Sequence, residues 1–371
     1  MLVLLLIAAS ALVILLLTMI MNLFIFPKLN ADDKPLSQPL VSLLIPARNE
    51  ADVIERTVQH ILAQSYTNIE VIILDDQSDD GTGKLALKAA NGDHRLQVIS
   101  GEELPSGWMG KSWACQTLGK HASGDILIFT DADVIWKPDA LSSVISQLQS
   151  AKVDMVTVWS TQITETFAER VTVPCIAMVI LGYLPTVMVH HSPLSMFAAA
   201  NGQVMAWRRA AYEAIGGHQL VANNVLDDVT LAKAAKKQGF RIRMVDGNNQ
   251  ILTRMYDDWD SVRDGFAKNI LAGYGGAIPL LLGTVFHWIV FLLPYVALLF
   301  PEYRLWAAII ILAGLALRAV SAIFTHQRVI DTFWMPLTVI LFTIIALQSL
   351  YWNVTGGPIW KGRKLGKDNM S

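Results

Sequence analysis

Residues 125–133 read DILIFTDAD, an apolar run that ends in two carboxylates separated by an alanine. Runs of this length, bounded by turn-forming residues, are typical of buried β-strands. Similar runs recur along the chain, and between them apolar residues recur at helical spacing. The strand-like runs are residues 41–45, 69–74, 96–99, 125–130 and 153–158, and the helix-like segments are residues 51–64, 82–90 and 139–148. This alternation predicts an α/β domain whose parallel sheet has helices on both faces.

The composition of the chain excludes several classes of protein. Of 371 residues, 53% are hydrophobic and 16% are charged, against roughly 25% charged residues in an average soluble protein. A disordered chain is therefore excluded. The net charge of −2 offers no basic surplus for nucleic acid, so no nucleic-acid partner is expected. The two cysteines lie far apart, which argues against a disulfide framework or a zinc ribbon.

Long apolar segments at both ends predict a membrane protein. Residues 2–26 carry no charged side chain, and a helix of that length would rise about 37 Å, enough to cross a hydrocarbon core of about 30 Å. We therefore expect residues 1–27 to be a retained transmembrane anchor and not a cleaved signal peptide. Residues 277–352 contain three more apolar stretches, expected to be transmembrane or interfacial helices, and residues 353–371 form a basic tail. Residues 38–270 lie between the two apolar regions and form the expected globular domain.

The charges beside these segments predict the orientation of the protein in the cell membrane. Lys28, Lys34 and Arg48 follow the anchor and place the globular domain in the cytoplasm of a multi-pass protein. Three full C-terminal spans would put the basic tail outside, which conflicts with its charge. Residues 277–300 contain two prolines, so we expect this stretch to be partly interfacial.

A further apolar stretch lies inside the globular domain. Residues 171–207 contain no Asp, Glu, Lys or Arg, and residues 171–190 are as apolar as a membrane span but contain Pro174 and Pro185. A core helix is one interpretation. We favour a segment that lies at the membrane surface beside the functional site of the domain.

Three acidic clusters lie where chemistry is expected. Asp131 and Asp133 follow a predicted strand and could hold a divalent cation together with phosphate oxygens, although paired aspartates also begin turns. Asp75 and Asp76 end another strand and need a partner, such as a nucleotide, because adjacent carboxylates repel each other. Asp227 and Asp228 open a predicted helix, where the helix dipole favours them, and one of them could act as a general base.

Together, and in this order, the clusters resemble glycosyltransferase family 2, the inverting transferases of GT-A fold that use nucleotide sugars. The resemblance covers roughly residues 40–270. It includes the stretches LLIPARNEADVIERTV, LDDQSDDGT, GKSWACQTLGKHASGDILIFTDAD, GQVMAWRRAAYEAIGG and LDDVTLA. A narrower resemblance, in GWMGKSWA and TGGPIWKGRKL, is to bacterial membrane glycosyltransferases of carotenoid and hopanoid pathways.

The resemblance implies a Rossmann-like, nucleotide-sugar-binding GT-A domain and a role for each matched residue. Asp228 corresponds to the catalytic base, and Asp131 and Asp133 to the ligands of Mg²⁺ or Mn²⁺. Gly216, Gly217 and Asp227 lie on the acceptor side. The residues implied in binding the nucleotide sugar are Pro46, Ala47, Arg48, Glu50, Asp75, Asp76, Lys111, Asp131, Ala132 and Asp133.

The function implied is transfer of one sugar from a nucleotide sugar, expected to be a UDP-sugar, to a lipid in the bilayer. A carotenoid, another terpenoid or a glycolipid precursor would fit as the acceptor. A polyprenyl-phosphate glycosyltransferase is an alternative that needs a basic cluster, for which the sequence offers only Arg208-Arg209. An inactive membrane scaffold is an alternative of a different class. The processive motif QxxRW is absent after Asp228, which argues against a polysaccharide synthase.

Overall fold

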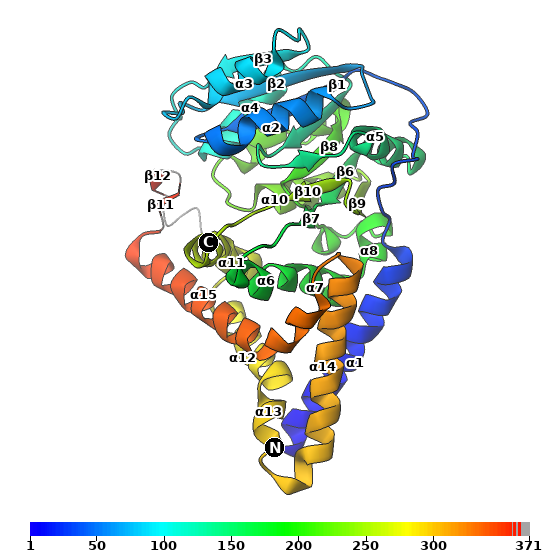
Figure 1. Ribbon diagram of the computed structural model, residues 1–371, viewed down its shortest axis with the longest axis vertical. Helices are drawn as coiled ribbons and strands as arrows, with labels where there is room; N and C mark the ends of the chain where they lie inside the picture. Colours follow the sequence, from blue (N-terminus) through cyan, green and yellow to red (C-terminus); the bar gives the residue numbers. More distant parts are fainter. Residues whose placement is uncertain (358, 361–362, 365–371) are drawn as a thin grey trace. The chain divides into compact units, whose positions relative to one another are not determined.

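The computed structural model describes residues 1–357, 359–360 and 363–364 (Figure 1). Its contacts divide the chain into two compact units. The sheet unit consists of Phe26–Thr161 and Val187–Arg254, and the helical unit consists of Met1–Ile25, Gln162–Thr186 and the chain from Met255 onward. Residues 162–186 and 255–270, which the sequence analysis places in the globular domain, therefore lie in the helical unit. The domain boundaries deduced from the sequence remain a prediction.

A seven-stranded sheet forms the centre of the sheet unit, in the order β3-β2-β1-β4-β8-β6-β9. The five strands predicted from the sequence run in the same direction, but the sheet is mixed, because β8, which was not predicted, runs antiparallel to both of its neighbours, β4 and β6. The other neighbouring pairs are parallel. The strands are β1 (Val41–Ala47), β2 (Ile69–Asp75), β3 (Leu96–Ser100), β4 (Ile126–Thr130), β6 (Met155–Trp159), β8 (Val204–Arg208) and β9 (Ile242–Asp246).

The antiparallel strand determines which segments share one edge of the sheet. In the β1–β2 pair Ala47 lies beside Asp75, and in the β4–β8 pair Thr130 lies beside Val204. The carboxyl ends of β1, β2 and β4 therefore lie at the edge where β8 begins. Ligands of α/β sheets bind at the carboxyl ends of strands, so this edge is where a site is expected.

Helices pack against both faces of this sheet. Alternate strand residues such as Leu43, Ile45 and Ile128 form a buried core with apolar residues of α2 (Ala51–Leu62), α3 (Thr82–Ala90) and α5 (Ala140–Ser150). On the other face Phe129 contacts Tyr212 of α9, and α4 packs against β1 and β2. The helices α4 (Gly110–His121) and α10 (Asp227–Lys237) contain residues of the expected site in their first turns, and α9 (Arg209–Ala214) precedes Gly216 and Gly217. The sequence analysis did not predict α4, whose apolar spacing is weak.

Short elements complete the sheet unit. The small strand β5 (Ile135–Trp136) pairs with β10 (Ile251–Thr253). The helix α8 (Thr186–His191) and the 3-10 turns η1 (Ser195–Phe197) and η2 (Gly217–Val221) lie in the segments that precede α10. The two-residue strand β7 (Thr161–Gln162) is the point at which the chain passes into the helical unit.

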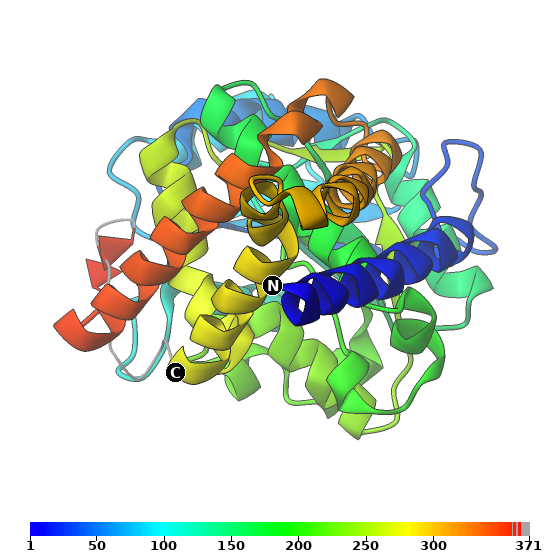
Figure 2. The same ribbon diagram turned by 90° about the horizontal axis from the view of Figure 1, so that it is seen from below.

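The helical unit contains three helices long and apolar enough to cross a membrane, as far as the described residues go: Leu2–Ile25, Pro301–Phe324 and Val329–Thr355. The first and second run side by side in Figures 1 and 2 and contact each other. The helices of this unit are α1 (Leu2–Ile25), α6 (Phe167–Thr172), α7 (Pro174–Tyr183), α11 (Trp259–Tyr274), α12 (Ala277–Phe291), α13 (Leu293–Ala297), α14 (Arg304–Phe324) and α15 (Met335–Thr355), with η3 (Pro301–Tyr303) and η4 (Val329–Trp334).

Two apolar stretches are interrupted at their prolines. The stretch at residues 277–300 divides into α12 and α13, and α12 is bent by 107° from α11. Neither α12 nor α13 is long enough to span a membrane alone, but α11 and α12 together are apolar enough to form a broken span or a re-entrant loop. The interfacial position of this stretch therefore stays a prediction. The stretch at residues 171–190 divides at Pro174 and Pro185 into three short helices. Of these, α7 packs against α1 and α14 within the helical unit.

The backbone strands β11 (Ile359–Trp360) and β12 (Arg363–Lys364) pair antiparallel after α15. The other residues of the predicted basic tail beyond Gly357 lie outside the described residues.

Close packing of Tyr256 against α11 leads to a stability prediction. A methyl group at Gly265 would overlap the ring of Tyr256, which is 9% exposed, whereas a methyl group at Gly273 of the same helix would meet no atom within 4 Å. Gly265→Ala should therefore destabilise the protein by about 1–3 kcal/mol. Gly273→Ala, the matched control, should be neutral or slightly stabilising. Thermal unfolding in detergent measures both, and equal midpoints would contradict this packing.

Candidate active site

The loop after β4 carries Asp131 and Asp133 at the edge where β8 begins. The N–H of Asp131 donates to Gln203 O (3.1 Å). Ala132 between the two carboxylates is 2% exposed, and its carbonyl accepts from Thr57 Oγ1 (2.5 Å). The alanine therefore fixes the loop to the core, while both carboxylates remain partly exposed to solvent.

Lys111 lies against the first of these carboxylates. It stands near the start of α4, and its Nζ is 2.5 Å from Asp131 Oδ1. Burial lowers the pKa of Lys111, but the charges of Asp131 and Asp227 outweigh it, so the net shift is upward. The lysine is therefore charged throughout the physiological pH range and supplies a fixed positive charge at this edge of the sheet.

The surroundings of Asp133 disfavour its ionised form. Burial and the neighbouring charges of Asp131 and Glu50 raise its pKa to about 7. A cation beside the carboxylates would relieve this repulsion, which fits a metal ligand. The described residues contain no group of three or more His, Cys, Asp or Glu side chains that could hold a metal. A cation at Asp131 and Asp133 would therefore need further oxygens from a ligand and from water.

The loop after β1 is tied to the loop after β2. Pro46 and Ala47 end β1, and Arg48 follows them. Nη1 of Arg48 donates to Asp76 O (2.6 Å) and lies 3.9 Å from Asp76 Oδ2. The N–H of Glu50 donates to Thr82 Oγ1 (2.9 Å) at the start of α3. These bonds make the two loops one surface beside the carboxylates of the β4 loop.

The two acids that end β2 have different surroundings. Asp75 accepts the N–H of Ser78 on Oδ1 (3.0 Å) and the N–H of Gly83 on Oδ2 (3.1 Å). The partner that the sequence analysis required for this acid is therefore found within the chain, where it shapes the loop. Asp76 is 6% exposed and faces Arg48.

Asp228 lies in the first turn of α10. Its carboxylate accepts the N–H of Gly202 (2.8 Å) and the N–H of Val229 (2.7 Å). Burial and the charge of Asp227 raise the pKa of Asp228 to about 6. An acid with this pKa is ionised at pH 7 and is more basic than an ordinary aspartate, which suits a general base.

The segment at residues 201–203 joins the two halves of the site. Gly202 and Gln203 lie in the stretch GQVMAWRRAAYEAIGG that carries the resemblance, but none of the three residues was predicted to belong to the site. Gly202 holds Asp228, and the carbonyl of Gln203 holds the N–H of Asp131. Asn201 donates from Nδ2 to Gln203 Oε1 (3.1 Å). The antiparallel direction of β8 brings these residues to this edge, and the sequence carries no signal for strand direction.

Gly216 and Gly217 form the turn between α9 and η2. Both have positive φ, 87° and 56°, a region in which glycine carries no steric penalty. A Cβ on Gly217 would lie 2.9 Å from the ring of Tyr212, whose hydroxyl contacts Nδ1 of buried His218 (2.7 Å). The turn is therefore fixed by its packing against Tyr212. The segment that follows it is bound to the start of α4, because Ala222 O accepts the N–H of Met109 (2.6 Å).

Arg208 and Arg209 lie at the opposite edge of the sheet. Arg208 ends β8, whose first residue, Val204, lies beside the β4 loop, and Arg209 begins α9. They line an open cavity of about 690 Å³ with Asp125 and Glu213. Asp131 and Lys111 do not line this cavity, so the basic pair noted in the sequence is separate from the candidate site.

Comparison with known proteins agrees with this geometry. Residues 42–195 match the profile of Glycosyl transferase family 2. The chain carries a family 2 glycosyltransferase domain. A relative, the 4,4'-diaponeurosporenoate glycosyltransferase of Staphylococcus aureus strain USA300, is 26% identical over 340 residues, covering 87% of this chain and 88% of the relative.

The glycosyltransferase also resembles a solved structure over nearly its whole length. A mannosyltransferase from Pyrobaculum calidifontis, determined in complex with GDP-Man and Mn²⁺, superposes with a TM-score of 0.56 at 19% identity. The match covers 94% of this chain and 99% of the other. The predicted GT-A fold of the glycosyltransferase is thereby confirmed.

Proposed function

We propose that the glycosyltransferase moves one sugar from a nucleotide sugar, a UDP-sugar, to a lipid acceptor in the cell membrane with inversion at the anomeric carbon. The observation that carries this proposal is the segment at residues 201–203. It connects the loop of Asp131 and Asp133 to the carboxylate of Asp228. Donor-binding groups and a base are thus held on one rigid edge of the sheet.

The donor half of the site would hold the diphosphate. Asp131 and Asp133 fit Mg²⁺ or Mn²⁺, because such ions are commonly bound by one or two protein carboxylates plus substrate phosphates. When bound, the metal would neutralise charge on the departing diphosphate. Lys111 adds a charge on the same side. The joined loops of Arg48 and Asp76 offer polar groups for the nucleoside.

The acceptor half would work through Asp228. In a single displacement the acceptor oxygen attacks the anomeric carbon as the bond to the diphosphate breaks, and the acceptor proton passes to Oδ of Asp228. The N–H groups of Gly202 and Val229 donate to this carboxylate and orient it, and they do not neutralise its charge. Alignment of donor and acceptor would supply much of the remaining acceleration.

The membrane lipid as acceptor is supported by two observations. Three helices are apolar enough to span a bilayer, within the part of the chain described. A relative matched over 87% of this chain carries the name of a carotenoid glycosyltransferase. A soluble acceptor would require none of these helices, so we infer an apolar acceptor such as a carotenoid or another terpenoid.

The decisive experiment is transfer itself. Purified full-length protein is incubated with Mn²⁺, a radiolabelled UDP-sugar and a lipid extract, and the labelled lipid is identified by mass spectrometry. GDP-mannose serves as the comparison donor. Label that enters the lipid phase from a UDP-sugar is the expected result. Label found only in free sugar, or transfer only from GDP-mannose, would contradict the proposal or its donor.

The pKa of Asp228 predicts the acid limb of the pH profile. The base must be ionised, and its pKa is raised to about 6. The rate of transfer to a hydroxyl acceptor should therefore rise with pH, reach half its maximum at about pH 6 and level off above pH 7. Initial rates at saturating donor and metal measure this. A limb with its midpoint near 4, as for an ordinary aspartate, would contradict the burial of Asp228.

The helices also predict on which side of the membrane the C-terminus lies. In Figure 1, α14 runs in the same direction as α1, so α12 and α13 would take the chain out of the cytoplasm and α14 would bring it back. With α15 lying at the membrane surface, the tail stays on the side of the sheet unit, which we place in the cytoplasm. Ser371, outside the described residues, is replaced by cysteine in a variant that has alanine at positions 115 and 175. An impermeant maleimide should label this cysteine in inverted vesicles and not in intact cells. Labelling in intact cells would reverse the assignment.

A further inference from the structure

Three arginines of the helical unit surround one small cavity that the proposed reaction does not use. Arg170 comes from α6, Arg318 from α14 and Arg328 from the segment after α14. With Thr164, Gln327 and Asp331 they line a space of about 10 Å³, which is about enough for a single oxygen-sized atom. Among the described residues that line this cavity, Asp331 is the one acid.

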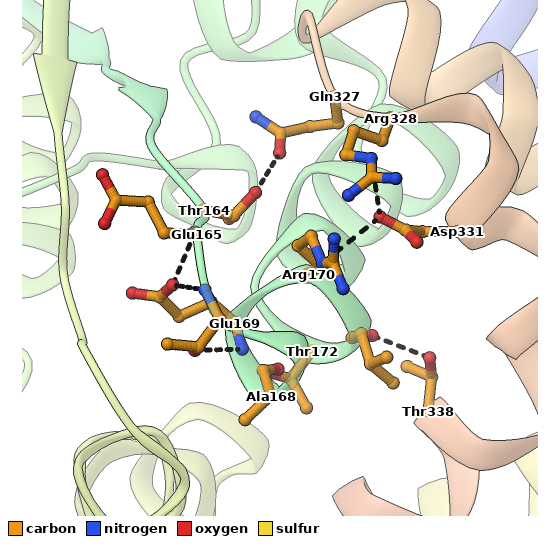
Figure 3. A network of polar contacts seen from close by, with 12 residues as sticks. Thr164, Glu165, Ala168, Glu169, Arg170, Thr172, Gln327, Arg328, Asp331 and Thr338 are labelled. Atoms are coloured by element: carbon orange, nitrogen blue, oxygen red, sulfur yellow. Dashed lines mark hydrogen bonds and ion pairs between the residues drawn. The ribbon is translucent and has the colours of Figure 1, made fainter.

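Asp331 does not use up the hydrogen-bonding capacity of the arginines around it. Asp331 Oδ2 lies 3.9 Å from Arg170 Nε and 3.8 Å from Arg328 Nε, both beyond hydrogen-bond length. Arg170 Nε is buried and has no hydrogen-bond partner. Figure 3 shows Arg170 and Arg328 converging on Asp331 from two segments of the chain. The guanidinium hydrogens thus have capacity for another anionic oxygen.

The third arginine brings a further positive charge to the cavity, and the groups to which it donates there are uncharged. Arg318 is 4% exposed and donates to Val171 O (2.9 Å) and to Thr338 Oγ1, both uncharged. Glu169 does not compensate, because its Oε2 accepts the N–H groups of Glu165 (2.6 Å) and Thr166 (2.5 Å) at the start of α6 (Figure 3). Three positive charges therefore share one negative charge around the cavity.

The position of the cavity in the helical unit indicates the kind of anion. It lies at the end of α14, beside the connection between two candidate spans. The 3-10 helix η4, which opens the second of these candidate spans, exposes a group of large apolar side chains, which is typical of segments at a membrane interface. They are Val329, Ile330, Phe333 and Trp334, which are 45%, 59%, 68% and 45% exposed. Lipid phosphates lie at this depth, and basic pockets between spanning helices bind lipid headgroups.

We propose that Arg170, Arg318 and Arg328 form a binding site for the phosphate of an anionic membrane phospholipid. One phosphate oxygen would enter the cavity between Arg170 and Arg328, while the acyl chains lie along the apolar side chains of η4. Arg328, whose side chain is 56% exposed, closes the site from the water side. The inference rests on the membrane location in the proposed function, but not on sugar transfer.

The test uses purified full-length protein in neutral detergent and follows its thermal unfolding midpoint as phosphatidylglycerol is added, with phosphatidylcholine as the reference. A ligand that binds only the folded state raises the midpoint. Wild type should respond to phosphatidylglycerol. In Arg328→Gln and Arg170→Gln the apparent affinity should fall about tenfold or more, since hydrogen bonds to charged groups are lost.

A matched control is provided by Arg304→Gln at the opposite end of the same helix. Arg304 is exposed and donates to Leu298 O (3.1 Å), so this variant should keep the full lipid response. Without lipid, Arg328→Gln should unfold at the wild-type midpoint. Asp228→Asn should also keep the response, which separates this proposal from failure of the proposed catalysis.

Two further ligands distinguish the source of the phosphate. Inorganic phosphate at the same concentration should not raise the midpoint, and a polyisoprenyl phosphate should act more weakly than phosphatidylglycerol. An equal response to inorganic phosphate would overturn the lipid site, and a response to polyisoprenyl phosphate alone would reassign it to an acceptor. No response to phosphatidylglycerol, or an undiminished one in both arginine variants, would overturn the proposal.

Discussion

Replacing Asp228 by asparagine is expected to slow sugar transfer to a hydroxyl acceptor by about 10²–10⁴-fold, the usual contribution of a general base. Asparagine has nearly the shape of aspartate and can keep the N–H bond from Gly202, but it cannot take a proton. Donor affinity should remain unchanged. Initial rates at saturating donor, together with the Kd for UDP, measure the two effects separately. Full residual activity on a hydroxyl acceptor would remove Asp228 from the base role.

The neighbouring acid provides the matched variant. The charge of Asp227 raises the pKa of Asp228, so Asp227→Asn should lower that pKa and move the acid limb of the pH profile below about pH 6. The rate at pH 7 should change far less than in Asp228→Asn. If the midpoint of the acid limb did not change in Asp227→Asn, the charge of Asp227 would not be what raises the pKa of Asp228.

The nature of the acceptor changes the size of the Asp228 effect. The name of the Staphylococcus aureus relative denotes a carboxylate, and a carboxylic acid is already ionised at pH 7. For such an acceptor no proton has to be removed, so Asp228→Asn should retain most of the transfer rate. Assaying the variant with paired alcohol and acid acceptors therefore distinguishes the two acceptor chemistries. Equal large losses with both would assign Asp228 to positioning instead.

Local sequence determines most of the strands and helices of the sheet unit. The predicted helix at residues 82–90 is observed at those residues, and the predicted strands at 41–45 and 69–74 extend by two residues and one residue. These elements combine apolar runs with clear turn residues at their ends. Helix α4 lacks such a pattern, since its sequence GKSWACQTLGKH mixes small and polar residues. Its helical state is favoured by tertiary packing against β1 and β2.

Strand direction and long-range partners could not be predicted in the same way. Nothing in VMAWR distinguishes an antiparallel strand from a parallel one, yet the direction of β8 places Gly202 beside Asp228 and Arg208 at the far edge. The backbone partners of Asp75 and the cavity of Arg170 and Arg328 likewise depend on segments far apart in the chain. The acidic positions themselves were predictable because each follows a strand or opens a helix.

The second large effect is expected at Asp133. Asp133→Asn should lower the rate of transfer by about 10²–10³-fold, because metal stabilisation of the departing diphosphate is worth several kcal/mol and each 1.36 kcal/mol corresponds to a factor of ten. Asp125→Asn changes an exposed acid beside the opposite end of the same strand and should leave the rate unchanged. Mn²⁺ affinity, measured by titration in the presence of UDP, should fall in parallel with the rate.

The pKa of Asp133 adds a signature that a purely structural role would not produce. Because the pKa is raised to about 7, protons compete with the metal in the neutral range. Mn²⁺ affinity of the wild type should therefore weaken progressively as the pH falls below 7, and this dependence should be lost in Asp133→Asn. Chelation by EDTA should stop transfer, and added Mn²⁺ should restore it. Activity that survives exhaustive chelation would instead assign neutralisation of the diphosphate to Lys111, which already lies 2.5 Å from Asp131.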